Sequence, residues 1–157
     1  MTPDQQQSIF AEVLLVEDNS SDENLILRAL SRKKLANKVY VVRDGEESLN
    51  FILRRGDFLH RGNRNLKVIL LDLKLPKING LDVLKELRSE EEAKNIPVVA
   101  LTSSNKDPDI DIAYNLGVNS YIKKPIIFED FINTIVQLGF YWAILNTTIK
   151  KVGRLFR

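Results

Sequence analysis

The chain has 157 residues, of which 44% are hydrophobic and 28% are charged, a composition typical of one soluble globular domain. It contains no cysteine, which excludes a disulfide framework, a thiol nucleophile and a zinc–cysteine cluster. The net charge of +2 does not by itself indicate nucleic-acid binding, and no run of about 18 apolar residues predicts a membrane helix. Residues 1–11 lack the basic start and apolar centre of a signal peptide. We expect them to form a flexible lead-in to a cytoplasmic protein.

Short apolar runs alternate with amphipathic segments along the chain. The runs, each a candidate strand, are residues 13–16, 39–42, 68–71, 97–101 and 120–123. Ser20 and Glu23 have the spacing of a capping box at the start of the first helix. Asp107 is predicted to be the N-cap of the fourth helix, with Pro108 in its first turn and Gly117 at its end. This alternation is typical of an α/β doubly wound fold. We predict a flavodoxin-like (βα)5 domain whose five-stranded parallel sheet has the order 2-1-3-4-5.

Carboxylates follow two of the predicted strands. Glu17 and Asp18 come directly after the first, and Asp72 ends the third. In the predicted order these two strands are neighbours, so the three carboxylates meet at one edge, where a pair about 4 Å apart repels by a few kcal/mol. A hard divalent cation such as Mg²⁺ would relieve that repulsion. Taken alone, Asp72 favours an ordinary turn residue or helix cap, and Glu17-Asp18 is equally consistent with a solvated turn and cap.

The fourth and fifth strands bring other polar groups to the same edge. Thr102 follows the fourth strand, and Lys123 and Lys124 end the fifth. A carboxylate, a metal site, a hydroxyl and an ammonium are the groups that phosphoryl transfer to an aspartate requires. In this interpretation Asp72 is the nucleophile, and Thr102 and a lysine bind the phosphoryl oxygens. Alone, Thr102 is also consistent with a β-branched strand end, and the lysines with a solvated one.

The combination of these motifs resembles the receiver domain of two-component response regulators, over residues 12–138. The matching residues are Glu17-Asp18, Asp72 with Pro76 and Asn79-Gly80, Thr102, and Lys124-Pro125. The resemblance implies that Asp72 accepts the phosphoryl group and that Asp18 and Asp72 ligate Mg²⁺. It also implies that Glu17 reaches the metal through water and that the backbone carbonyl of Lys74 is a further ligand.

The resemblance assigns roles to the last strand as well. Lys124 matches the lysine of the family, which leaves Lys123 pointing outward, and the Lys124–Pro125 peptide is expected to be cis. Thr102 matches the hydroxyl of the conformational switch, and Tyr121 matches its aromatic residue. Phosphorylation is expected to draw Thr102 inward and let Tyr121 rotate toward the core.

Two residues depart from the family pattern. Asn79 stands where Asp is more common before the glycine, a change that we expect a turn with positive φ to tolerate. Lys74 places a positive side chain over the site. We hypothesise that it pairs with Glu17 or with the phosphoryl group and hinders the hydrolytic water.

We divide the chain into the lead-in, a receiver domain with an extended last helix over 12–146, and a basic amphipathic tail over 147–157. The tail is interpreted as a solvated or dimer-packed end, with a helix that binds a partner or an anionic membrane surface as the alternative.

The loop over 56–65 and the aromatic-rich residues 140–145 are features similar to those of the stand-alone regulators paired with phytochrome kinases. Those regulators tend to dimerise through the face that carries the aromatic residues.

The resemblance therefore implies a single-domain response regulator, with no enzymatic activity beyond self-catalysed phosphotransfer and slow autodephosphorylation. Its donor would be a sensor histidine kinase, with a bacteriophytochrome among the candidates, and His60 is not expected to relay phosphoryl groups. With no further folded domain expected, output would pass to a partner through the face of the fourth helix, fifth strand and fifth helix. A homodimer through the same face is expected, without nucleic-acid binding.

Two other classes of function are compatible with an α/β fold of this kind. The first is a receiver-fold scaffold that acts without phosphorylation, which the presence of the complete residue set disfavours. The second is a flavodoxin-like or phosphatase-like enzyme. No glycine-rich phosphate loop follows the first strand, and Lys74 occupies the position where a haloacid-dehalogenase-type phosphatase would have its second aspartate.

Overall fold

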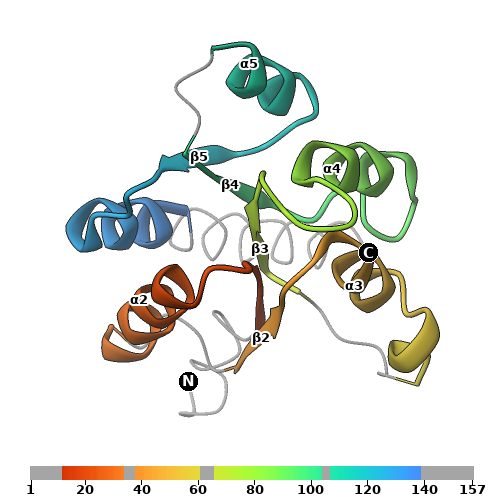
Figure 1. Ribbon diagram of the computed structural model, residues 1–157, viewed down its shortest axis with the longest axis horizontal. Helices are drawn as coiled ribbons and strands as arrows, with labels where there is room; N and C mark the ends of the chain where they lie inside the picture. The colour runs from red at the N-terminus through yellow and green to blue at the C-terminus, as the bar shows by residue number, and fades with distance from the viewer. Residues whose placement is uncertain (1–11, 34–37, 61–65, 104–106, 139–157) are drawn as a thin grey trace, which may run out of the picture.

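The structure is a computed structural model that describes residues 12–33, 38–60, 66–103 and 107–138. Its strands are β1 (Glu12–Val16), β2 (Lys38–Val42), β3 (Val68–Asp72), β4 (Val98–Thr102) and β5 (Ser120–Lys123). All pair in parallel, in the order β2-β1-β3-β4-β5 (Figure 1). The predicted flavodoxin-like topology is confirmed.

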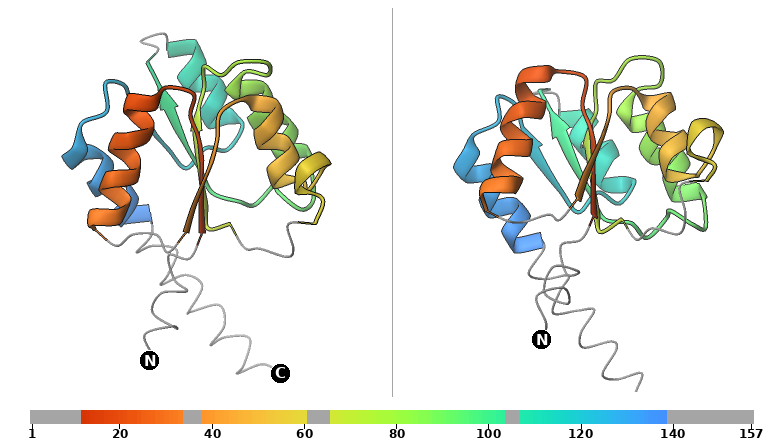
Figure 2. Two further views of the ribbon diagram at one scale, coloured as in Figure 1. Left: turned by 60° about the horizontal axis from the view of Figure 1, so that its bottom comes forward. Right: turned by 90° about the horizontal axis from the view of Figure 1, so that it is seen from below.

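Helices cover both faces of this sheet. They are α2 (Ser20–Arg32), α3 (Gly45–Ile52), the 3-10 helix η2 (Gly56–Phe58), α4 (Gly80–Ser89), α5 (Asp107–Asn115) and a last helix over residues 128–138. Helix α2 and the last helix lie on one face, whereas α3 and α4 lie on the other (Figure 2). No helix in the described ranges is long and apolar enough to cross a membrane.

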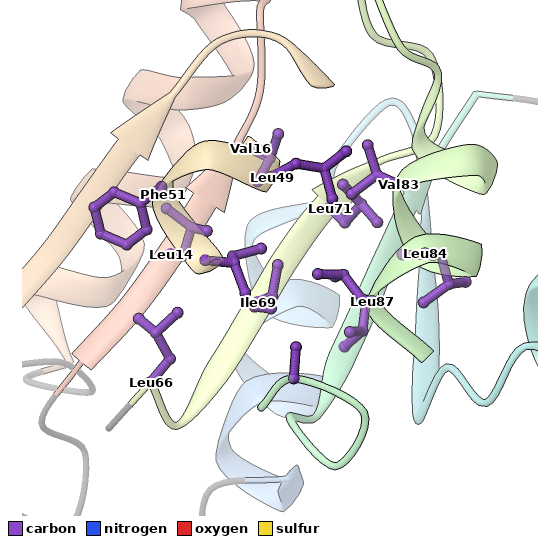
Figure 3. Packing of buried hydrophobic residues seen from close by; sticks show 14 of the residues in the cluster. Leu14, Val16, Leu49, Phe51, Leu66, Ile69, Leu71, Val83, Leu84 and Leu87 are labelled. Atoms are coloured by element: carbon purple, nitrogen blue, oxygen red, sulfur yellow. The ribbon is translucent and has the colours of Figure 1, made fainter. Parts of the chain in front are cut away.

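The unbroken apolar runs of the central strands follow from this two-sided cover. Successive residues of one strand point to opposite faces of the sheet. Leu14, Ile69 and Leu71 belong to the cluster beneath α3 and α4 (Figure 3), whereas Leu15 and Leu70 belong to the cluster beneath α2 and the last helix. Each such buried side chain stabilises the fold by about 1.5–3 kcal/mol. The strand ends are thereby held in fixed register.

Some local expectations are corrected. Helix α2 begins at Ser20, but its N-cap is Asn19, whose side-chain oxygen accepts the backbone N–H of Asp22 at 2.9 Å. The predicted capping box is wrong by one residue, because an asparagine caps as well as a serine. Asn79 likewise caps α4 with a φ of −71°, and the positive φ falls on Lys77 at 68°.

The two ends of α5 have different outcomes. Asp107, which was expected as the N-cap, is the first residue of the helix, and the residue before it is not described. Gly117 ends this helix with a φ of 83° and donates its backbone N–H to the carbonyl of Tyr114, as predicted. The predicted lead-in, residues 139–146 of the extended last helix, and the tail over 147–157 lie outside the described residues.

Candidate functional site

The acidic residues meet as the strand order requires. Val16 of β1 is paired with Leu71 of β3, so the residues that follow these two positions emerge side by side. Carboxylate oxygens of Glu17, Asp18 and Asp72 all lie within 4.8 Å of one another. Glu17 and Asp72 are buried, with 1% and 3% exposure, whereas Asp18 is exposed. The site is therefore a buried pair of carboxylates with a third at its mouth.

Both carboxylate oxygens of Asp72 are held. Oδ1 accepts the backbone N–H of Lys74 at 2.9 Å, and Oδ2 accepts the ammonium of Lys124 at 2.9 Å. The side chain of Lys74 is exposed. Glu17, one of the two partners that we considered for Lys74, is bound by Lys124 instead, at 2.9 Å from Oε1. The carboxylate of Asp72 is thus fixed in orientation before any ligand binds.

Lys124 reaches the site from the end of β5. The register pairs Thr102 with Lys123, and the backbone N–H of Lys124 donates to the Thr102 carbonyl at 2.7 Å. Lys123 is exposed and the peptide between Lys124 and Pro125 is cis, as expected. The Lys124 ammonium also lies 3.0 Å from Oδ2 of Asp22. Asp22 was not among the predicted site residues, because it belongs to no motif of its own.

Burial and charge shift the protonation of two of these groups in the same direction. Burial raises the pKa of Glu17 to about 7, with a further rise from the neighbouring Asp72 carboxylate and an opposing effect of Lys124. Burial alone would lower the pKa of Lys124, but its hydrogen bonds to Glu17, Asp72 and Asp22 outweigh burial and raise that pKa. Lys124 is therefore a permanent cation, whereas Glu17 takes up a proton near neutral pH.

An open cavity of about 500 Å³ gives access to the site. Its lining combines apolar and polar side chains: Asp18, Leu73, Lys74, Leu75, Pro76, Asn79, Leu81, Thr102 and Asp109. Thr102 is buried at 1% exposure and still lines this cavity. A small anion entering here would meet the Thr102 side chain beside the acidic cluster.

The donor set fits a hard divalent cation. Carboxylate oxygens are the ligands that Mg²⁺ prefers, and it binds through one or two of them together with waters and phosphate oxygens. The clustering of Glu17, Asp18 and Asp72, with Asp18 open to solvent, suits that mode of binding. The carbonyl of Lys74 as a further ligand stays a prediction.

The loop after β3 is fixed by two glycines. A Cβ on Gly80 would lie 2.4 Å from the carbonyl oxygen of Asp72, and a Cβ on Gly45 would lie 1.9 Å from that of Ile78. Gly45 also donates its backbone N–H to the carbonyl of Pro76. The loop therefore rests on the start of α3, a contact that the sequence analysis did not foresee at Gly45.

Tyr121 lies on β5, next to β4, and away from the carboxylates of the site. It is 38% exposed and packs edge-on against Tyr114 of α5, with ring centroids 5.9 Å apart. In the register of β4 and β5 it is paired with Ala100, two residues before Thr102. This position outside the core is the starting point that a switch by rotation requires. The roles of Thr102 and Tyr121 as a switch stay predictions.

The sequence matches the family model described as the response regulator receiver domain over residues 13–136. The chain belongs to this family. It is 41% identical over 136 residues to the probable methanogenesis regulatory protein FilR2 of Methanothrix harundinacea, covering 85% of this chain and 84% of that protein. It is 34% identical over 130 residues to the response regulator Rcp1 of Synechocystis, with 83% and 87% covered.

Solved structures of response regulators have the same fold as this chain. The bacteriophytochrome response regulator RtBRR is 52% identical and superimposes with a TM-score of 0.74, covering 82% of this chain and 77% of that one. The Mn²⁺-bound form of Rcp1 is 32% identical with a TM-score of 0.72, covering 84% and 94%. The receiver domain is therefore similar to phytochrome response regulators, as the sequence analysis inferred.

Proposed function

We propose that this receiver domain accepts a phosphoryl group on Asp72 from a sensor histidine kinase in the cytoplasm, in a Mg²⁺-dependent reaction. The observation that carries the proposal is the buried Asp72 carboxylate at a strand end, held by Lys124 and grouped with Glu17 and Asp18. A cluster of carboxylates of which two are buried favours a site that binds a cation or carries out a reaction. An ordinary turn aspartate would be solvated.

The chemistry follows from these groups. A carboxylate oxygen of Asp72 attacks the phosphorus of the donor phosphohistidine, the P–N bond breaks, and its electron pair stays on the imidazole nitrogen. The product is an acyl phosphate, whose oxygens accept hydrogen bonds from Lys124 and Thr102. Mg²⁺, held by the acidic cluster, would supply positive charge to the site. Water later attacks the phosphorus, the P–O bond to Asp72 breaks, and inorganic phosphate leaves; this slow hydrolysis is the only turnover that we propose.

Signalling would use the output face, by which we mean α5, β5 and the helix over 128–138. In the proposed change the Thr102 hydroxyl moves toward the phosphoryl group and Tyr121 turns into the space it leaves. The output face carries exposed apolar side chains, which supports homodimerisation through it: Ile112, Tyr114 and Val136. The similarity to RtBRR and Rcp1 supports a phytochrome-type kinase as donor.

Acetyl phosphate and Mg²⁺ test the proposal without knowledge of the kinase. On a phosphate-sensitive gel the wild type should shift, Asp72→Asn should not, and the control Asp82→Asn, which removes an exposed carboxylate from the first turn of α4, should shift like the wild type. An unmodified wild type would contradict the proposal and favour the scaffold that acts without phosphorylation.

A further inference from the structure

Lys124 has more anionic partners than the proposed reaction requires. Its ammonium lies 2.9 Å from Oδ2 of Asp72, 2.8 Å from Oε2 of Glu17 and 3.0 Å from Oδ2 of Asp22. A lysine ammonium has three N–H donors, and three carboxylates surround this one: Glu17 and Asp72 accept hydrogen bonds from it, and Asp22 forms an ion pair with it. A phosphoryl oxygen can therefore gain a hydrogen bond from Lys124 only if one of the present acceptors gives way.

Asp22 is the partner that gives way most easily. Its side chain is 23% exposed, whereas those of Glu17 and Asp72 are 0% and 5% exposed. Water can replace Lys124 at an exposed carboxylate but not at a buried one, which would be left unpaired at high cost. Asp22 also lies outside the group of carboxylates that could hold a metal ion.

The backbone around Asp22 does not depend on this contact. Asp22 is in the first turn of α2, where its backbone N–H donates to the Asn19 side chain at 2.9 Å. Its neighbour Glu23 instead pairs with Arg43, at 2.6 Å. Two adjacent carboxylates of one helical turn thus have different partners, which makes Glu23 a natural control.

We propose that Asp22 is a positioning residue that holds Lys124 in the unphosphorylated protein and releases it to the phosphoryl group. The inference rests on the proposed function. Asp22 competes for a donor and adds negative charge near the site where the phosphoryl group forms, and both effects oppose phosphorylation. Removing its charge should therefore strengthen the binding of an anion at Asp72, the opposite of what loss of a supporting residue would do.

Fluoroberyllate, a phosphoryl mimic that binds to an aspartate, tests this by calorimetric titration at saturating Mg²⁺. The variants are Asp22→Asn, Asp22→Glu and Glu23→Gln, each checked for the thermal unfolding temperature of the full chain. Asp22→Asn should bind fluoroberyllate about tenfold more tightly than the wild type, since a hydrogen bond to a charged group contributes about that factor. Asp22→Glu, which keeps the charge, and Glu23→Gln should bind like the wild type.

The outcomes separate the two proposals. Equal or weaker binding by Asp22→Asn, with a wild type that binds, would overturn the role of Asp22 and leave the proposed function standing. Tighter binding by Glu23→Gln to the same extent would also overturn it, because a general charge effect would then suffice. A wild type that binds no fluoroberyllate would overturn the proposed function together with the role of Asp22.

Discussion

The ammonium of Lys124 lies 2.9 Å from Oδ2 of Asp72, so the expected phosphoryl-binding cation already neutralises the expected acceptor. The same ammonium contacts both carboxylate oxygens of Glu17, whose side chain has no exposed surface. One cation therefore compensates two buried anions that lie side by side. This arrangement makes the site costly to disturb.

Lys124→Gln should destabilise the protein by about 3 kcal/mol at pH 8, because it leaves two buried carboxylates without their cation. The loss should be smaller at pH 5, where Glu17 can take up a proton. The free energy of unfolding in urea measures both values. Lys123→Gln is the matched control, since its exposed side chain predicts a change within about 0.5 kcal/mol. Equal effects of the two substitutions would contradict this account of the site.

Glu17 predicts a pH dependence of stability with a definite sign. Its pKa is about 7 in the folded protein against an ordinary value of 4.5, so folding favours the protonated form. The resulting stability is fully present below pH 4.5 and is lost as the pH rises through about 7.

Relative to Glu17→Gln, the wild type should therefore lose up to about 3 kcal/mol of unfolding free energy between pH 5 and pH 8. Urea unfolding of both proteins across this range measures the difference. Saturating Mg²⁺ should reduce it, since a bound cation favours the charged carboxylate. A difference that does not vary with pH would show that Glu17 keeps its ordinary pKa.

Two glycine substitutions separate crowding from backbone conformation. Gly80→Ala should cost roughly 3 kcal/mol, because the new Cβ would lie 2.4 Å from the backbone oxygen of Asp72. Gly56→Ala should cost only about 1 kcal/mol, since its neighbours leave room and only its φ of 56° is unfavourable. Thermal and urea unfolding give the two values. Similar costs would mean that the loop beneath Asp72 adjusts freely.

Much of this site follows from the sequence for one physical reason. Parallel strands end at the same edge, so the residues that end β1, β3, β4 and β5 had to converge once the order was known. Residues such as Glu17, Asp72, Thr102 and Lys124 could therefore be grouped without coordinates.

Contacts that long side chains make with distant parts of the chain could not be predicted in this way. Arg88 donates hydrogen bonds to the backbone carbonyls of Lys94, Ile96, Leu116 and Gly117, and thereby ties two loops to α4. Nothing in the local pattern distinguishes it from a solvated helical arginine. Asp22 was missed for the same reason: its partner is more than 100 residues away in the chain.

The proposed switch predicts a measurable movement of residue 121. Tyr121 is 38% exposed, and its ring packs edge-on against that of Tyr114. A Tyr121→Trp substitution in a Trp142→Phe background places the only indole of the chain at this position. Fluoroberyllate with Mg²⁺ should then reduce acrylamide quenching of its fluorescence, because the inward rotamer is shielded from solvent.

Two further variants identify the cause of that change. Adding Thr102→Ala should abolish the reduction in quenching while leaving fluoroberyllate bound, since the hydroxyl that couples the site to β5 is gone. Placing the indole at Tyr114 instead should give no reduction, because that ring has no reason to turn inward and loses its neighbour when residue 121 moves. Unchanged quenching at position 121 in the fluoroberyllate-bound protein would mean that phosphorylation is read out by another part of the output face.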